Sequence, residues 1–241
     1  MARVAIVNGG TRGIGRAISE RLKADGFTVA ANYAGNDAAA QAFSSETGIA
    51  VYKWDVGSYE ACAEGIAKVE ADLGPVDVVV NNAGITRDAT LHKMTQAQWD
   101  DVIRTDLTSI FNMCRLVIEG MRARSYGRIV NISSINGQKG QIGQANYSAA
   151  KAGMIGFTKA LAQEAASKGI TVNVIAPGYV DTEMVAAVPE AVLQKIIGTI
   201  PVGRLGKAEE IARAVSFLTA EDAGFITGAT LTVNGAQYIA G

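Results

Sequence analysis

The sequence predicts an α/β fold in which a doubly wound parallel sheet of about seven strands carries helices on both faces. Short runs rich in valine and isoleucine recur along the chain, and longer stretches with the apolar spacing of helices separate them. Continuously apolar strands indicate a sheet that is buried on both sides, as parallel sheets are. The regular alternation of strand and helix then favours the doubly wound arrangement.

The strands are expected where the apolar runs lie, at residues 4–7, 28–33, 51–54, 76–80, 128–132, 171–175 and 230–233. Helical patterning covers residues 17–24, 59–73, 99–121 and 149–167, and Asp37 is expected to start another helix. Thr95 and Gln98 have the spacing of a capping box, and Gly26 and Gly169 follow helices where a chain often turns away. No linker or repeat interrupts the pattern, so residues 1–241 are expected to form one domain.

One late stretch, residues 181–206, differs from the rest of the pattern. It carries Pro189, Pro201 and several glycines around a short helical segment. Segments of this composition often move over a bound ligand, so we expect a mobile substrate lid within residues 181–206.

Composition excludes several classes of function. Lysine and arginine (22) nearly balance aspartate and glutamate (23), and no basic block stands out, so neither nucleic acid nor an anionic membrane is an expected partner. No run reaches membrane-spanning length and no signal peptide precedes the first strand, which predicts a cytoplasmic protein. Cys62, Cys114 and His92 are too isolated for a disulfide framework or a metal site, and no metal is expected.

A glycine-rich loop follows the first predicted strand directly. The segment Asn-Gly-Gly-Thr-Arg-Gly-Ile-Gly at residues 8–15 places glycines where a tight turn and a close approach of the backbone to a pyrophosphate would need them. The pattern alone also fits an ordinary glycine-rich turn, but the strand before it and the helix after it favour a dinucleotide site. The expected contacts come from Gly9, Thr11, Arg12, Gly13, Ile14 and Gly15.

The end of the second predicted strand indicates which nicotinamide cofactor binds. An acidic residue there would bind the ribose 2′-hydroxyl group and repel a 2′-phosphate, but the strand ends in Ala31, Asn32 and Tyr33. Arg12 can meet a phosphate instead, although a solvated loop arginine is a nearly equal interpretation of that residue by itself. NADPH is therefore favoured over NADH, with Asn32 beside its ribose.

Tyr147 and Lys151 form the most informative pair in the chain. Residues four apart on a helix share a face, so a phenol and an ammonium group at this spacing can reach one bound molecule. A free phenol has a pKa of about 10, and a neighbouring cation favours its ionised form, which suits it for proton transfer. Ser134, at the end of an apolar run, can donate a hydrogen bond to a carbonyl oxygen on which negative charge develops.

Five motifs in order and in register resemble the short-chain dehydrogenase/reductase family: the glycine loop, Asn-Asn-Ala-Gly at residues 81–84, Ser134, the Tyr147 and Lys151 pair, and Pro177-Gly178. The resemblance spans essentially the whole chain and implies a Rossmann-type reductase. It assigns proton donation to Tyr147 and a second role to Lys151, on the nicotinamide ribose. Further cofactor contacts implied in this way come from Asp55, Val56, Asn82, Ala83, Gly84, Pro177, Gly178, Val180 and Thr182.

Two residues depart from the family pattern. Asn8 stands where many relatives have threonine, and both side chains can hydrogen-bond in a turn. Asp106 stands where the family usually has an asparagine that organises a proton relay to Lys151. An ionised Asp106 would offset part of the charge of Lys151, so we expect an active enzyme with a shifted pH profile, which Asp106→Asn would test.

The residues near the catalytic pair also resemble the acetoacetyl-CoA reductase branch of the family. That resemblance implies that hydride from NADPH reduces acetoacetyl-CoA to 3-hydroxybutyryl-CoA in polyhydroxyalkanoate synthesis, with substrate contacts from Asp88, Gln141, Gln144 and Tyr179. Gln141 and Gln144 have an equal alternative, in which they only brace their loop.

Two other functions remain open at this point. A 3-oxoacyl-(acyl-carrier-protein) reductase would share most of these residues, and a non-catalytic NADP-binding sensor would share the fold. Loss of the tyrosine or the lysine would mark a sensor, and both are present. By analogy with the family, residues 99–121, 149–167 and 230–241 are expected to build a homotetramer.

Overall fold

The computed structural model describes residues 2–186 and 189–239, and within them seven strands form one parallel sheet in the order β3-β2-β1-β4-β5-β6-β7. The predicted fold class is confirmed. The strands are β1 (Val4–Val7), β2 (Thr28–Tyr33), β3 (Ala50–Lys53), β4 (Val76–Asn81), β5 (Gly127–Ile132), β6 (Ile170–Pro177) and β7 (Thr230–Val233).

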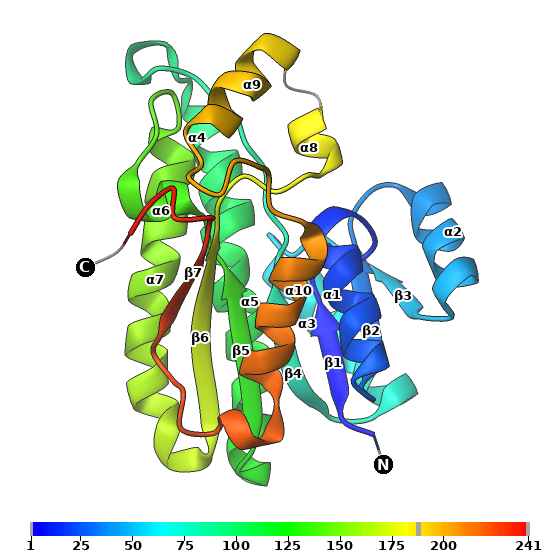
Figure 1. The fold of residues 1–241 in the computed structure, drawn as a ribbon. Helices are drawn as coiled ribbons and strands as arrows, with labels where there is room; N and C mark the ends of the chain where they lie inside the picture. The colour runs from blue at the N-terminus through cyan, green and yellow to red at the C-terminus, as the bar shows by residue number, and fades with distance from the viewer. Residues whose placement is uncertain (1, 187–188, 240–241) are drawn as a thin grey trace.

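Helices cover both faces of the sheet (Figure 1). The long helices are α1 (Gly13–Ala24), α2 (Asp37–Thr47), α3 (Tyr59–Leu73), α4 (Gln96–Ile103), α5 (Ser109–Arg124), α7 (Ala145–Ala165), α9 (Glu190–Gly198) and α10 (Ala208–Thr219). Shorter turns are η1 (Leu91–Lys93), η2 (Arg104–Thr108), α6 (Ile135–Lys139), η3 (Ala166–Lys168), α8 (Glu183–Ala186) and η4 (Glu221–Ala223).

Two apolar layers separate the sheet from these helices. On one face α3, α5 and α7 bury side chains such as Ile66, Met113 and Met154 against the strands. On the other face α1, α2 and α10 do the same with Leu22 and Phe43. Because successive strand residues point to opposite faces, every residue of β1 is buried, which explains its uninterrupted apolar run.

One expected helix has an internal change of hydrogen-bonding pattern. Residues 99–121 were expected to form a single α-helix, but α4 passes into the π-helical turn η2 before α5 begins. The apolar spacing carries no mark of this change because the chain stays helical throughout. A π-helical turn inside a helix is rare and often lies at a functional site, and Asp106 lies within this one.

Helix ends agree with the expected signals. The Thr95 hydroxyl oxygen accepts the Gln98 amide at 3.2 Å, and the Thr95 amide donates to the Gln98 side chain at 2.9 Å. Gly169 follows η3 with a left-handed φ of 67°, which a glycine adopts without strain.

The strand order reverses between β1 and β4, and this switch point locates the site. In doubly wound sheets, ligands bind outside the carboxyl ends of the strands where the order changes. The glycine loop follows β1 there, and residues 81–84 end β4 beside it. Helices α8 and α9 lie beyond the same edge of the sheet (Figure 1).

Candidate active site

The glycine loop is tied to the end of β4. The Asn82 amide donates to the carbonyl oxygens of Asn8 at 3.1 Å and of Gly9 at 3.2 Å. A Cβ atom on Gly15 would collide with the Gly9 carbonyl oxygen and lie 2.7 Å from the Asn82 amide nitrogen. Only glycine therefore lets the first turn of α1 pack this closely against the loop.

The N-terminus of α1 is open to an anion. Arg12 is the N-cap residue, and within the described residues its side chain makes no capping hydrogen bond. The first turn carries no acid, so its amide groups and the positive end of the helix dipole suit a phosphate. The cradle of glycine backbone and free amides fits the pyrophosphate of a dinucleotide.

The segment after β6 lies next to this cradle. A Cβ atom on Gly13 would lie 3.7 Å from the Thr182 methyl group, so Thr182 closes one side of the loop. Gly178 lies on the other side of β6 from this contact, and a Cβ atom there would be 2.8 Å from Asn234. Val180 is buried. Of the predicted nicotinamide-side residues, Thr182 is thus the one that contacts the predicted pyrophosphate loop.

The residues at the end of β2 present no carboxylate to a ribose. Asn32 is buried; its amide donates to the Trp54 carbonyl oxygen at 3.0 Å, and its own oxygen accepts the Gly9 amide at 3.5 Å. Asp37 lies in the first turn of α2, where its hydrogen bond to Lys53 holds the pKa of its carboxyl group below the usual value. Asn32 thus shapes the loop, and Arg12 remains the charged group exposed there.

The predicted adenine-side pair has largely structural contacts. The Asp55 carboxylate accepts Arg104 at 2.6 Å and the Gly57 amide at 2.8 Å, and it remains half exposed. Val56 is buried, and its carbonyl oxygen accepts the Asn112 amide at 3.0 Å. Asp55 and the surface of this turn are therefore the parts of the predicted pair that solvent reaches.

A chain of buried amides crosses the sheet beneath the switch point. Asn8 donates to Asn81, Asn81 donates to Asn131, and Asn131 donates to the Thr158 hydroxyl oxygen of α7, each at 2.8 Å. All four side chains are buried, so satisfied hydrogen bonds hold β1, β4, β5 and α7 in register. Asn8, which departs from the family pattern, takes part in this chain. Asn131 and Thr158 were not expected, because only the strand register brings them together.

Tyr147 and Lys151 lie on α7 as predicted. The Lys151 ammonium nitrogen is 5.4 Å from the centre of the Tyr147 ring, 3.1 Å from the Ile132 carbonyl oxygen and 3.3 Å from Asp106. Burial lowers the pKa of Lys151, but the charges of Asp106 and Tyr147 outweigh it, so this pKa lies above its usual value. The amine therefore stays a cation at neutral pH.

Ser134 is held with its proton available. It is the N-cap residue of α6, and its hydroxyl oxygen accepts the Asn136 backbone amide at 3.1 Å. That bond uses an acceptor lone pair and leaves the O–H free to donate outward. A Cβ atom on Gly137 would lie 2.7 Å from the Lys151 backbone, so α6 packs directly on α7 at this lysine. The short helix α6 was not expected from the sequence.

The predicted substrate residues gather on two adjoining loops. Ala89 bridges to Gln144, and the Gln144 amide donates to Asp88 at 2.9 Å while its oxygen accepts the Asn136 amide at 2.9 Å. Both ends of Gln144 are thus engaged within the protein, which favours the bracing interpretation for this residue. Gln141 is exposed on the same loop.

Tyr179 follows β6 and is half-buried. Burial, and then the charges of Asp88 and Tyr147, raise the pKa of its phenol. Tyr147 and the cation of Lys151 lie on α7, and the Ser134 hydroxyl group caps the adjoining helix α6. A phenol, a hydroxyl donor and a fixed cation are the groups that reduction of a carbonyl group needs.

Comparison with known proteins agrees with this geometry. A family model described as enoyl-(acyl carrier protein) reductase matches residues 9–236. An acetoacetyl-CoA reductase of Shinella zoogloeoides is 71% identical over 239 residues, 99% of each chain. The chain belongs to the short-chain dehydrogenase/reductase family. The family resemblance predicted from the sequence is confirmed.

Two more relatives bear on the substrate of this reductase. An acetoacetyl-CoA reductase of Rhizobium meliloti (strain 1021) is 68% identical over 241 residues, 100% of both chains. A 3-oxoacyl-(acyl-carrier-protein) reductase of Escherichia coli (strain K12) is 46% identical over 242 residues, 98% of each chain. Both relatives act on a 3-oxoacyl group by name, and the chain is an oxidoreductase that uses a nicotinamide cofactor.

The expected lid segment of this reductase starts and ends at one place. Val180 bridges to Gly206, with hydrogen bonds from the Asp181 amide to the Gly206 carbonyl oxygen at 2.8 Å and from the Gly206 amide to the Tyr179 carbonyl oxygen at 2.9 Å. The excursion between them contains α8 and α9. Its residues 187 and 188 lie outside the described residues, and its mobility stays a prediction.

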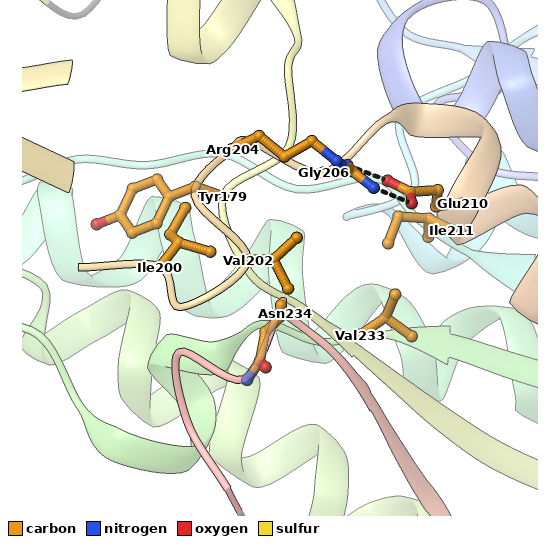
Figure 2. Close-up of a pocket in the computed structure, with 10 residues that line it drawn as sticks. Tyr179, Ile200, Val202, Arg204, Gly206, Glu210, Ile211, Val233 and Asn234 are labelled. Carbon is orange, nitrogen blue, oxygen red and sulfur yellow. Dashed lines mark hydrogen bonds and ion pairs between the residues drawn. The ribbon is translucent and has the colours of Figure 1, made fainter. Parts of the chain in front are cut away.

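A pocket lies behind the returning end of this segment (Figure 2). Ile200, Val202 and Ile211 form apolar walls, and Arg204 reaches across to Glu210 with two contacts of 2.8 Å. Figure 2 shows the Tyr179 hydroxyl group pointing away from this pocket. The pocket therefore belongs to the base of the segment and not to the catalytic cleft of the reductase.

Residues 2–186 and 189–239 contain no cluster of three or more His, Cys, Asp or Glu side chains that could hold a metal ion. Cys62 and Cys114 are buried thiols within this part of the chain, and His92 is exposed in η1. None of the helices in the same residues is long and apolar enough to cross a membrane.

Proposed function

We propose that the protein reduces acetoacetyl-CoA to 3-hydroxybutyryl-CoA with NADPH, as a step of polyhydroxyalkanoate synthesis. The observation that carries the proposal is that Tyr147 and the buried cation Lys151 lie together on α7, while α6, which Ser134 caps, packs directly on Lys151. Full-length relatives at 71% and 68% identity that are named acetoacetyl-CoA reductases support the choice of substrate.

The cofactor would be held by the glycine loop and by the ends of β4 and β6. The free amides of α1 suit its pyrophosphate, and the exposed Arg12 suits a 2′-phosphate, since the end of β2 offers no carboxylate to a ribose. Gly84 and Thr182 border the space for the nicotinamide ring. When bound, NADPH supplies the hydride that the 3-keto carbon accepts.

The side chains of the protein handle the oxygen and its proton. Ser134 donates a hydrogen bond to the keto oxygen and stabilises the charge that develops there. Tyr147 donates the proton that turns this oxygen into a hydroxyl group. Lys151, held as a cation, stabilises the ionised phenol that remains after this transfer. It also takes part in the proton relay that reprotonates the phenol. Asp88, Gln141 and Tyr179 are the proposed contacts of the acyl thioester.

The second candidate is reduction of a 3-oxoacyl group on acyl-carrier-protein. Identity of 46% to the Escherichia coli enzyme of that name favours it, and both substrates would present the same reacting carbonyl group. A non-catalytic NADP sensor is a different class, and the intact pair of Tyr147 and Lys151 argues against it.

A spectrophotometric assay separates these functions. We expect acetoacetyl-CoA to drive oxidation of NADPH faster than a 3-oxoacyl-carrier-protein does, and NADPH to be used in preference to NADH. A faster reaction with the carrier-protein substrate would replace the first function by the second, and no reaction with either would favour the sensor.

Tyr147→Phe tests the proton donor. The variant removes a hydroxyl group and leaves the ring, so we expect kcat to fall by about a hundredfold or more while the Kd for NADPH stays near native. Tyr52→Phe is the matched control, since it loses the same atom in β3, where the hydroxyl group bonds Asp72 at 3.2 Å. Equal activity of the two variants would remove Tyr147 from the proposed role.

Assembly and location complete the proposal. We expect a homotetramer in the cytoplasm, built through the outer faces of α5 and α7 and the chain beyond Thr230. Phe111 stacks on Tyr59 at 6.3 Å between ring centres while both remain exposed, which suits a face that a second copy covers. Residues 240 and 241 lie outside the described residues. Light scattering of the eluted protein would test the tetramer.

A further inference from the structure

Asp106 connects two donors from different parts of the fold. It lies in the π-helical turn η2 and is fully buried. One carboxylate oxygen accepts the Ile85 backbone amide at 2.8 Å, and the other lies 3.3 Å from the Lys151 ammonium nitrogen. The carboxylate therefore links the segment after β4, which borders the cofactor, to the catalytic helix α7.

The geometry requires two acceptor oxygens at this position. A carboxylate has two, whereas an asparagine amide has one oxygen and an NH₂ group that can only donate. In this backbone an asparagine at position 106 would turn a donor toward either Ile85 or Lys151. A carboxylate therefore offers an acceptor to the Ile85 amide and a negative charge to Lys151 at the same time.

The surroundings leave little room for another arrangement. A Cβ atom on Gly84 would lie 2.8 Å from the Asp106 oxygen and 3.2 Å from the Lys151 nitrogen, so the backbone at Gly84 covers the ion pair. Within the pair, Lys151 comes from α7. Tyr147, on the same helix, is the other titratable group whose charge acts on the pair. The segment after β4 contributes the Ile85 amide and β5 the Ile132 carbonyl oxygen. Arg104, on the same turn as Asp106, is turned outward to Asp55.

We propose that Asp106 is a positioning residue whose ionised carboxylate holds Lys151 and the segment after β4 in one arrangement, so that turnover requires an ion pair beneath the catalytic tyrosine. This inference rests on the proposed reductase function and deepens it. Asp106 acts through Lys151 and does not touch the reacting atoms. In this chain a direct charge contact therefore replaces the neutral amide expected for the family.

The ionisation of both groups supports the proposal. Burial raises the pKa of Asp106, and the charge of Lys151 and the Ile85 amide offset only part of that effect. Asp106 thus takes up a proton at a higher pH than an exposed aspartate, whose pKa is about 3.9. The raised pKa of Lys151 depends in turn on Asp106. The native enzyme is expected to lose activity on the acid side and to keep it far into the alkaline range.

The test is the pH profile of kcat and of kcat/KM for native protein and Asp106→Asn. We expect the variant to lose kcat about tenfold to a hundredfold at neutral pH, because the ammonium group is displaced. Its acid limb should disappear, and its alkaline limb should move to lower pH because Lys151 loses its counter-charge. Asp100→Asn, the same change at an exposed acid of α4, is the matched control and should keep the native profile.

A second variant covers the case in which Asp106→Asn does not fold. Gly84→Ala keeps the carboxylate but places a methyl group against it, which disturbs its contact with Lys151. The alkaline limb of the pH profile should therefore move to lower pH, as in Asp106→Asn, while the acid limb should remain. Profiles of either variant that superimpose on the native one would overturn the positioning role.

A measurement without turnover separates this inference from the proposed function. The melting temperature of native protein minus that of Asp106→Asn should increase as the pH falls. In native protein the raised pKa of Asp106 lets the folded state bind an extra proton, which stabilises it at lower pH. In the variant Lys151 is buried without a partner, so its charged form costs stability as the pH falls. If native protein reduces no substrate and this trend holds, only the proposed function fails. A constant difference in melting temperature would overturn the inference whatever the activity.

Discussion

The molecule carries two kinds of ion pair, and they differ in what surrounds them. Asp106 and Lys151 are buried under the catalytic cleft, with their side chains 0% and 4% exposed. Arg12 and Glu183 meet at 4.0 Å with their side chains 75% and 81% exposed, between the glycine loop and α8. Burial makes the first pair part of the fold, whereas water screens the second and leaves Arg12 available to a ligand.

The two pairs differ in whether the cation is held in one position or stays accessible to solvent. A cation that must hold one position throughout turnover is surrounded by backbone and paired within the interior. Arg12, the proposed partner of a phosphate, lies in solvent with a weak partner. The largest effects are therefore expected when the interior pair is broken.

Lys151→Met breaks the interior pair and leaves Asp106 as an unpaired buried acid. We expect the free energy of unfolding to fall by about 3–5 kcal/mol at neutral pH, together with loss of activity. The loss of stability should shrink as the pH is lowered, because Asp106 can then take a proton. Denaturant unfolding at one protein concentration and several pH values measures it.

The double variant Lys151→Met with Asp106→Asn tests whether the loss of stability comes from the unpaired charge of Asp106. Removing the second charge should recover part of the lost stability, since no unpaired carboxylate remains in the interior. If the double variant loses as much stability as Lys151→Met and Asp106→Asn together, the two charges do not interact.

Arg12→Ala tests the exposed cation. We expect KM for NADPH to rise about tenfold to a hundredfold, which is what a hydrogen-bonded charge pair with phosphate is worth, while KM for NADH stays near native. Stability should not change, since the pair with Glu183 is exposed. Glu183→Gln is the control from the other side of the pair and should leave KM for NADPH the same or lower. A parallel rise for both cofactors would show that Arg12 does not read the 2′-phosphate.

The smallest effect is expected at Arg204 and Glu210, an exposed pair at the base of the lid segment. The Arg204 contact, and then the Lys207 amide, lower the pKa of Glu210 to about 2. Its stabilising contribution is therefore present at neutral pH and is lost as the pH falls toward 2. Glu210→Gln should lower the melting temperature slightly at neutral pH, and the difference should close in acid. A difference that stays constant with pH would assign it to packing.

Much of the fold follows from local signals in the sequence. The bounds of β1, β2, β7 and α3 agree with the predicted ranges, because short runs that contain valine, isoleucine or threonine mark the strands and a serine cap marks the helix. The start of α1 was placed four residues late, at residue 17 instead of Gly13, because glycines weaken a helical pattern. Helix α10 was missed, although its apolar residues lie along one buried face.

The candidate site likewise has parts that local sequence signals predict and parts that depend on contacts between distant segments. Tyr147, Lys151 and the glycine loop could be found from spacing, since helix and loop geometry place them locally. The family resemblance placed Asp106 near Lys151, but their direct 3.3 Å contact joins residues 45 positions apart and depends on a π-helical turn that the sequence did not predict. The engagement of Gln144 with Asp88 and Asn136 likewise depends on two loops meeting.

The bridge between Val180 and Gly206 has a consequence for how such enzymes diverge. An excursion whose two ends are already joined can be exchanged without disturbing the sheet from which it departs. Doubling the length of such a loop costs only about 0.6 kcal/mol of closure entropy. The segment between these two ends can therefore change in length or sequence while the strands of the sheet stay as they are.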